Sequence, residues 1–153
     1  MTDHKAITDA ELHEVKGAAG AASGTVPVSN GAGAAPFGVA PHRYAIEVTI
    51  PDISTASTQY IGIPYAGDIL KITTAIDGTI ATADADITAK INTVAVTDGV
   101  VTVAFSGSAA GDIDTATPTA ANAVVEGDLL TIETDGASTN AVTCNVTVMI
   151  EVT

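Results

Sequence analysis

Carboxylates are the only ionisable groups that the sequence supplies in quantity, and several of them stand two residues apart. The pairs lie in stretches rich in Gly, Ala and Thr: Asp84 with Asp86, Asp112 with Asp114, and Glu126 with Asp128. Acidic loops can supply the oxygen ligands that Ca²⁺ prefers. The run from Asp84 to Ile87, however, breaks the spacing of a calcium loop at its third ligand position. We therefore interpret these carboxylates as solvated turn residues and expect no cofactor or metal.

The histidines and the cysteine do not form a catalytic or zinc-binding pattern. His4, His13 and His42 are dispersed in or beside the first 42 residues, and the only cysteine is Cys144. A nucleophilic triad needs a rigidly held His, and zinc needs three or four ligands close together. Cys144 alternates in phase with valines, which predicts a small buried side chain with a raised pKa. We expect no enzyme; a small hydrolase, the alternative, would show a carboxylate pair of perturbed pKa in a cleft.

Two further motifs carry little chemistry. The run from Gly31 to Pro36 lacks the final glycine of a dinucleotide-binding fingerprint, and no strand or helix pattern flanks it. A carboxylate pair for glycoside hydrolysis usually lies among aromatic side chains, but aromatics make up 3% of the chain and Trp is absent. Neither a phosphate site nor a glycosidase site is therefore predicted.

Charge and composition narrow the class of protein. The 153 residues include 18 acidic and 5 basic ones, for a net charge of −13. Such a chain repels nucleic acid, and without a run of 18 or more apolar residues we expect no spanning helix. It begins without the apolar segment of a secretory signal. Its apolar residues are mostly Ala, Val and Ile, beside abundant Thr, which favours β-structure.

The composition changes at about Pro41–Arg43, which predicts an N-terminal arm over residues 1–42 and a β domain over 43–153. In the arm, Thr8 and Glu11 have the spacing of a capping box, and Gly17 can end a short helix over residues 9–16. Such a short helix must dock on something to persist. The stretch from Thr25 to Val28 is predicted to be extended.

The second part reads as a series of short strands. Alternating apolar residues predict strands over 43–50 and 142–152, with weaker candidates at 60–63, 69–76, 87–96, 100–105 and 129–133. The alternation changes phase at Asn92 and Thr93, which we interpret as a bulge or bend rather than a strand interior. Turns are expected at 77–78, 98–99, 107–112, 126–128 and 135–136. This spacing predicts an all-β fold, a β-sandwich for which the jelly roll is one candidate topology.

The arm resembles a segment found in virion proteins of tailed bacteriophages. The likeness covers about residues 8–40 and is carried by the runs from His13 to Gly17 and from Gly24 to Gly33, followed by Phe37. In that family the segment introduces a β-rich domain. The β domain is similar to phage head-decoration, cement and head-fibre domains in composition only, and it lacks the long repeats of fibre shafts.

The resemblance implies a structural protein that decorates or cements the exterior of a phage capsid, with the major capsid protein as partner. The capsid-docking residues would be Leu12, His13, Val15, Lys16, Val26, Val28 and Phe37. Trimers suit local three-fold positions of a capsid, so we expect a homotrimer, with Ala45, Val94 and Val96 in its subunit contacts. Nucleic acid and membranes are not expected as partners. The alternative is a tail- or fibre-associated module that binds a host receptor.

Overall fold

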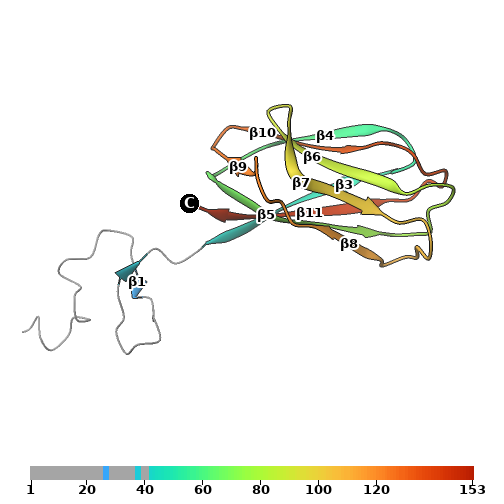
Figure 1. Ribbon diagram of the computed structural model, residues 1–153, viewed down its shortest axis with the longest axis horizontal. Helices are drawn as coiled ribbons and strands as arrows, with labels where there is room; N and C mark the ends of the chain where they lie inside the picture. Colours follow the sequence, from blue (N-terminus) through green and yellow to red (C-terminus); the bar gives the residue numbers. More distant parts are fainter. Residues whose placement is uncertain (1–25, 28–36, 39–41) are drawn as a thin grey trace, which may run out of the picture. The chain divides into compact units, whose positions relative to one another are not determined.

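The computed structural model describes residues 26–27, 37–38 and 42–153, and the last of these ranges forms a compact unit. It consists of two antiparallel sheets that face each other (Figure 1). Sheet I contains, in spatial order, β3 (Arg43–Ile50), β11 (Cys144–Val152), β5 (Gly67–Ile76) and β8 (Ile113–Ala116), and β9 (Ala123–Val124) also pairs with β5. Sheet II contains β4 (Ser57–Gly62), β10 (Leu129–Thr134), β6 (Ala85–Ile91) and β7 (Val94–Val103). The prediction of an all-β, sandwich-like domain is confirmed.

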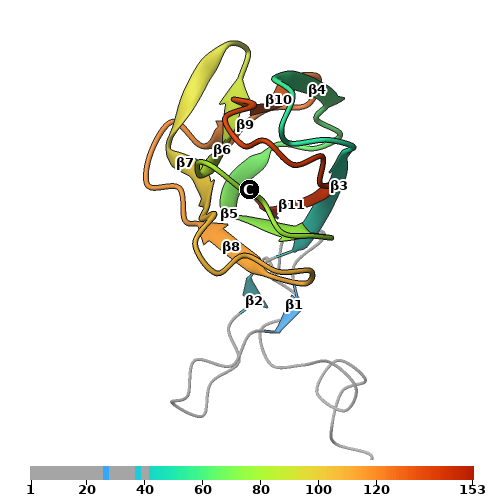
Figure 2. The same cartoon turned by 90° about the vertical axis from the view of Figure 1, so that its right-hand side faces the viewer.

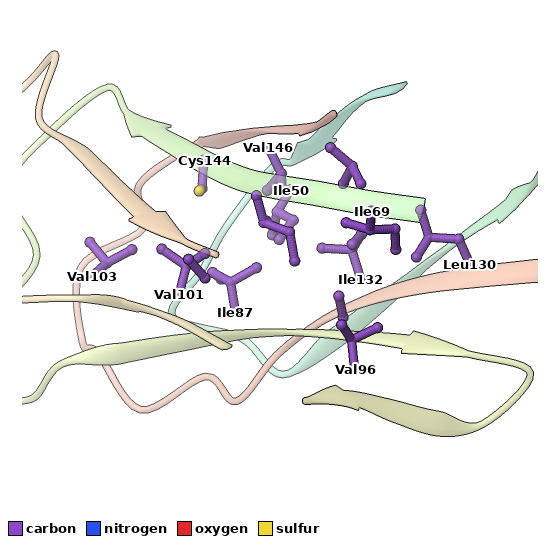
Figure 3. Packing of buried hydrophobic residues seen from close by; sticks show 14 of the residues in the cluster. Ile50, Ile69, Ile87, Val96, Val101, Val103, Leu130, Ile132, Cys144 and Val146 are labelled. Carbon is purple, nitrogen blue, oxygen red and sulfur yellow. The ribbon is translucent and has the colours of Figure 1, made fainter. Parts of the chain in front are cut away.

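The core lies between the two sheets and is built from Ile, Val, Leu and Ala (Figure 3). In β11 every second residue from Cys144 to Ile150 is buried, and these residues face buried residues of sheet II such as Ile87 and Ile132. Full burial of one such side chain stabilises the fold by about 1.5–3 kcal/mol. The abundance of β-branched residues therefore serves both strand formation and packing.

Two strands begin and end close to where the alternation predicts them. β3 covers the predicted residues 43–50, and its Tyr44, Ile46, Val48 and Ile50 face the core as expected. β11 begins two residues later than predicted, although Val142 is buried as expected. Val152 is more exposed than predicted, because it lies at the end of the strand beyond the core.

The predicted strand over residues 87–96 is wrong, because the chain reverses within it. Asn92 and Thr93 have φ values of 47° and 78°, and β6 and β7 form a hairpin around them. These residues interrupt the strand, as expected, but they form a tight turn at which the chain reverses, and not a bulge. The predicted turn at Asp98–Gly99 is instead an irregularity inside β7, where the β6–β7 register shifts between Thr88 and Lys90.

Two strands of the β domain were not predicted from the sequence. β8 pairs with residues 72–75 of β5, and β9 pairs with residues 67–68 of the same strand. Ile113 of β8 is 65% exposed, whereas the small Ala116 is buried. The apolar alternation that reveals the other strands is therefore weak in this segment.

Candidate interaction surfaces

The predicted docking residues of the arm are described only in part. β1 (Val26–Pro27) and β2 (Phe37–Gly38) are short strands that pair antiparallel, with Val26 opposite Gly38 and Pro27 opposite Phe37. The predicted extended stretch is therefore confirmed at Val26–Pro27. Outside the described residues lie the predicted helix over 9–16 and Leu12, His13, Val15, Lys16 and Val28.

Residue 42, where the arm joins the domain, lies at one end of the sandwich, which we call the junction end. This end comprises His42, Val152 and the loops over residues 63–66, 92–93 and 125–128. The Val152 N–H donates a hydrogen bond to the His42 carbonyl (2.8 Å). The Ile63 N–H donates to the carbonyl of Asp128, and the Gly127 N–H donates to the carbonyl of Ile63 (both 2.9 Å). Main-chain bonds thus hold neighbouring loops of this end in one arrangement.

Asp128 links two of these loops through its side chain. Its Oδ1 accepts a hydrogen bond from the Asn92 amide (2.6 Å), and its Oδ2 accepts one from the Val125 N–H (2.9 Å). The Asn92 Oδ1 in turn accepts a bond from the Leu129 N–H (2.9 Å). The Val125 N–H, followed by the Asn92 amide, lowers the pKa of Asp128 below its ordinary value. The carboxylate therefore fixes the β6–β7 hairpin against the loop that precedes β10.

The junction end exposes several large apolar side chains. Tyr65 and Val125 are about three-fifths exposed (63% and 59%), and Val94, Leu129 and Val152 are exposed beside the same loops. The Tyr44 hydroxyl donates to the Tyr65 carbonyl (2.9 Å), and the two rings meet edge to face at 6.1 Å between centroids. Exposed apolar side chains that gather at one place are typical of a contact surface.

The opposite end of the sandwich, on the right in Figure 1, is called the distal end. Its loops cover residues 51–56, 77–84, 104–112 and 135–143, and they contain no Lys or Arg. The charged residues of these loops are Asp52, Asp77, Asp84, Asp112 and Asp135. The junction loops also lack Lys and Arg, but they contain only two carboxylates, Glu126 and Asp128. Because the distal end also exposes Phe105 and Ile113, the two ends differ mainly in the number of their carboxylates.

The distal carboxylates accept hydrogen bonds from nearby main-chain N–H groups. Asp77 accepts from Thr143 (2.8 Å), Asp84 from Phe105 (2.9 Å), and Asp112 from Ala109 (2.7 Å). Such bonds brace turns and loops, which agrees with our interpretation of Asp84 and Asp112 as turn residues. The interpretation is wrong for their partners Asp86 and Asp114, which lie in the strands β6 and β8 and are partly buried. Within residues 42–153 and the two short strands of the arm, no three His, Cys, Asp or Glu residues come together as a metal site would require.

Cys144 behaves as the sequence predicts. Its side chain is fully buried in the core, and burial raises the pKa of its thiol to about 11. A thiol with this pKa stays protonated at neutral pH and is a poor nucleophile. Cys144 is therefore a packing residue.

The predicted subunit contacts need one correction. Ala45 and Val94 are exposed, as such contacts require, but Val96 is only 3% exposed and belongs to the core. The hairpin at Asn92–Thr93 accounts for the difference, because Val96 lies in the returning strand and points inward. Sequence reasoning also missed Tyr65, Val125 and Leu129, whose common location depends on which loops meet.

No protein-family model matches the chain, and no curated protein sequence matches it. The resemblance of residues 8–40 to bacteriophage virion proteins therefore stays a prediction from the sequence. In the part of the chain that the structure describes, no helix is long and apolar enough to cross a membrane.

Proposed function

We propose that this chain is a structural protein of a tailed-bacteriophage virion, which decorates or cements the outer surface of the capsid through its N-terminal arm. The observation that carries the proposal is the contrast between the two ends of the domain. The arm joins at the junction end, where Tyr65 and Val125 are exposed, and the loops of the distal end carry five carboxylates against two in the junction loops. The resemblance of residues 8–40 to phage virion proteins indicates that the arm binds the surface of a capsid.

This contrast suits a protein that stands on a particle. An apolar junction end can lie against the capsid, where burial of Tyr65, Val125 and Leu129 adds to the binding by the arm. An acidic distal end can face solvent, where its uniform negative charge discourages particles from aggregating. The protein has no catalytic role in this proposal, and its partner is the major capsid protein.

The arm and the number of copies act together in the proposal. A short helix around Leu12 and Val15 gains order when it docks on the capsid, so a single arm binds weakly. Three arms linked in a homotrimer bind more tightly, because the second and third arms bind at a high effective concentration. A trimer also matches the local three-fold positions of an icosahedral shell.

The proposal includes a jelly-roll topology for the domain. Counting the eight longer strands from β3, sheet I has the order first, eighth, third, sixth, and sheet II has the order second, seventh, fourth, fifth. This is the strand order of a jelly roll, a fold common in viral capsid proteins. The order supports the topology, and function is argued separately from the two ends of the domain.

Substitutions in the arm test the proposal. We expect Val15→Asp and Phe37→Asp each to weaken binding to capsids that lack this protein by about tenfold or more, because each removes an apolar contact and adds a charge. Binding is measured by co-sedimentation of the full chain with such capsids. The matched control is Ile113→Asp, which adds the same charge at an exposed position of β8.

The thermal unfolding transition of the domain shows whether a variant loses capsid binding alone or also loses the stability of its fold. It should stay almost unchanged in Val15→Asp and Phe37→Asp, because both positions precede the domain. Full capsid binding by both variants would contradict the proposal. A large loss of thermal stability would show instead that the arm packs on its own domain.

A further inference from the structure

The two sides of the sandwich are closed to different degrees. On the side of β7 and β8, the Thr97 N–H donates to the Ala120 carbonyl (3.0 Å), and the Thr119 N–H donates to the Thr97 carbonyl (3.1 Å). These bonds join sheet II to the segment between β8 and β9 of sheet I. On the other side, where β3 and β4 are neighbours in Figure 2, no main-chain hydrogen bond joins the two sheets within residues 42–153.

This open side, which we call the β3–β4 edge, leaves core-facing apolar side chains half exposed. Tyr44, Ile46 and Val48 of β3 and Ile61 of β4 pack against the core but are only partly buried. Their neighbours in β11, from Val146 to Ile150, are fully buried on the same face. The β3–β4 edge is therefore the part of the core that residues 42–153 do not cover.

β3 also offers a regular row of main-chain groups. Its pairing with β11 runs without a shift from Arg43 to Ile50, and the strand contains no proline. The His42 carbonyl bonds to β11, so in an antiparallel ladder the N–H and C=O groups of Arg43, Ala45, Glu47 and Thr49 point away from β11. Long, regular edge strands of this kind readily pair with a further strand.

The charge of the β3–β4 edge sets it apart from the rest of the domain. The two strands contain one basic and one acidic residue, Arg43 and Glu47, and so are neutral in a chain whose net charge is −13. Two copies of an acidic protein repel each other least where their surfaces are neutral. The edge is therefore the place where like-charged copies can approach.

We propose that the β3–β4 edge is a contact surface between copies of this chain. When two β3 strands pair antiparallel with Ala45 opposite Ala45, each Arg43 lies opposite the Glu47 of the other copy. The main-chain groups that point away from β11 then bond to one another, and Tyr44 lies opposite Ile46 across the seam. The strand is thus complementary to itself in charge, hydrogen bonding and apolar contact. The inference does not depend on the proposed capsid function.

The test measures the mass of the full chain in solution by light scattering and sedimentation over a range of concentrations. We expect an assembly whose mass is an even multiple of 15.1 kDa, because antiparallel β3–β3 pairing joins copies two at a time. Ala45→Pro should halve this mass, with a dissociation constant of the β3–β3 contact raised by about tenfold or more. The proline removes an N–H that points to the edge, not to β11.

The matched control is Thr115→Pro in β8, the opposite edge of sheet I. The Ile76 N–H bonds to the Asp112 carbonyl, so the Thr115 N–H likewise points away from β5. This variant should keep the parent mass. A second pair of variants, with milder substitutions, controls for misfolding of the proline variants. Val48→Thr should weaken self-association, whereas Val100→Thr, on an exposed part of β7, should not.

Three results would overturn the inference. A full chain that stays monomeric at high micromolar concentration shows that the edge does not join copies. An assembly that survives both Ala45→Pro and Val48→Thr shows that copies meet elsewhere. An equal loss of self-association in the edge variants and in their controls shows a general effect on folding. A monomeric chain would also contradict the homotrimer of the proposed function, whereas docking by the arm itself is tested separately by the arm variants.

Discussion

Two aspartates illustrate how one side chain type takes opposite roles in this domain. Asp128 accepts bonds from the Val125 N–H and the Asn92 amide, and these bonds lower its pKa. Asp114 is the second residue of β8, where burial, and then the nearby carboxylate of Asp112, raise its pKa. Ionisation therefore favours the folded state at Asp128 and disfavours it at Asp114.

We expect Asp128→Asn to lower the melting temperature at pH 7 and Asp114→Asn to leave it unchanged or raise it. Both variants remove one negative charge, so the change in net charge is matched. The asparagine at 128 turns one acceptor into a donor that faces the Val125 N–H or the Asn92 amide. Differential scanning calorimetry of both variants beside the parent checks the two directions.

The pH dependence follows from the direction of each shift. A lowered pKa gives stability that is present above the unfolded-state value of about 4 and is lost as pH falls through the folded value. The gap between Asp128→Asn and the parent should therefore narrow in acid, because the parent's own Asp128 becomes protonated. Equal melting temperatures for both variants at pH 7 would show that these bonds do not affect stability.

The β6–β7 hairpin offers a prediction at the scale of one element. Asn92 and Thr93 both have positive φ, as the tight turn of a hairpin requires, but a β-branched residue is strained there. We expect Thr93→Gly to stabilise the domain by about 1 kcal/mol, because glycine adopts this conformation freely. Thr93 is exposed, so little packing is lost. Urea denaturation measures the change.

The control for this hairpin is Thr115→Gly, in the regular strand β8. Glycine weakens an ordinary strand position, so this variant should lose stability. If Thr93→Gly lost as much stability as Thr115→Gly, the backbone of the turn would not be strained.

The strands that could be predicted from the sequence are those with one buried and one exposed face. Residues 43–50 are the clearest case, because their alternation matches the burial of β3. The hairpin could not be recognised, because a bulge and a two-residue turn both shift the phase between Ile91 and Val94. The turn also lacks the glycine that usually marks it.

Asp98–Gly99 shows the converse error. The pair has the composition of a turn, yet it lies within β7, where Asp98 has a φ of 56° and a Cβ on Gly99 would lie 2.7 Å from that of Val96. The positive φ favours Asp at position 98, and the close approach of Val96 requires Gly at position 99. The two residue types are therefore explained without a turn between strands. The candidate surfaces could not be recognised from the sequence because Tyr65 and Val125 belong to loops far apart in the chain. Main-chain hydrogen bonds hold these loops together at the junction end.

At the scale of the whole molecule, the distribution of charge matters more than its sum. The net charge of −13 excludes nucleic acid as an expected partner but does not say which surface binds a protein. The structure adds that the distal loops contain carboxylates as their only charged residues, whereas the β3–β4 edge is neutral. The distal loops suit a surface that faces solvent, and the neutral edge suits a contact between copies of the chain.

The central claim, that the chain coats the outside of a phage capsid, is tested most directly by its copy number in purified virions. Quantitative mass spectrometry gives the ratio of this chain to the major capsid protein. The account predicts many copies at a fixed ratio to that protein. A handful of copies per virion would contradict it and favour a tail or fibre module, and absence from virions would remove the structural role altogether.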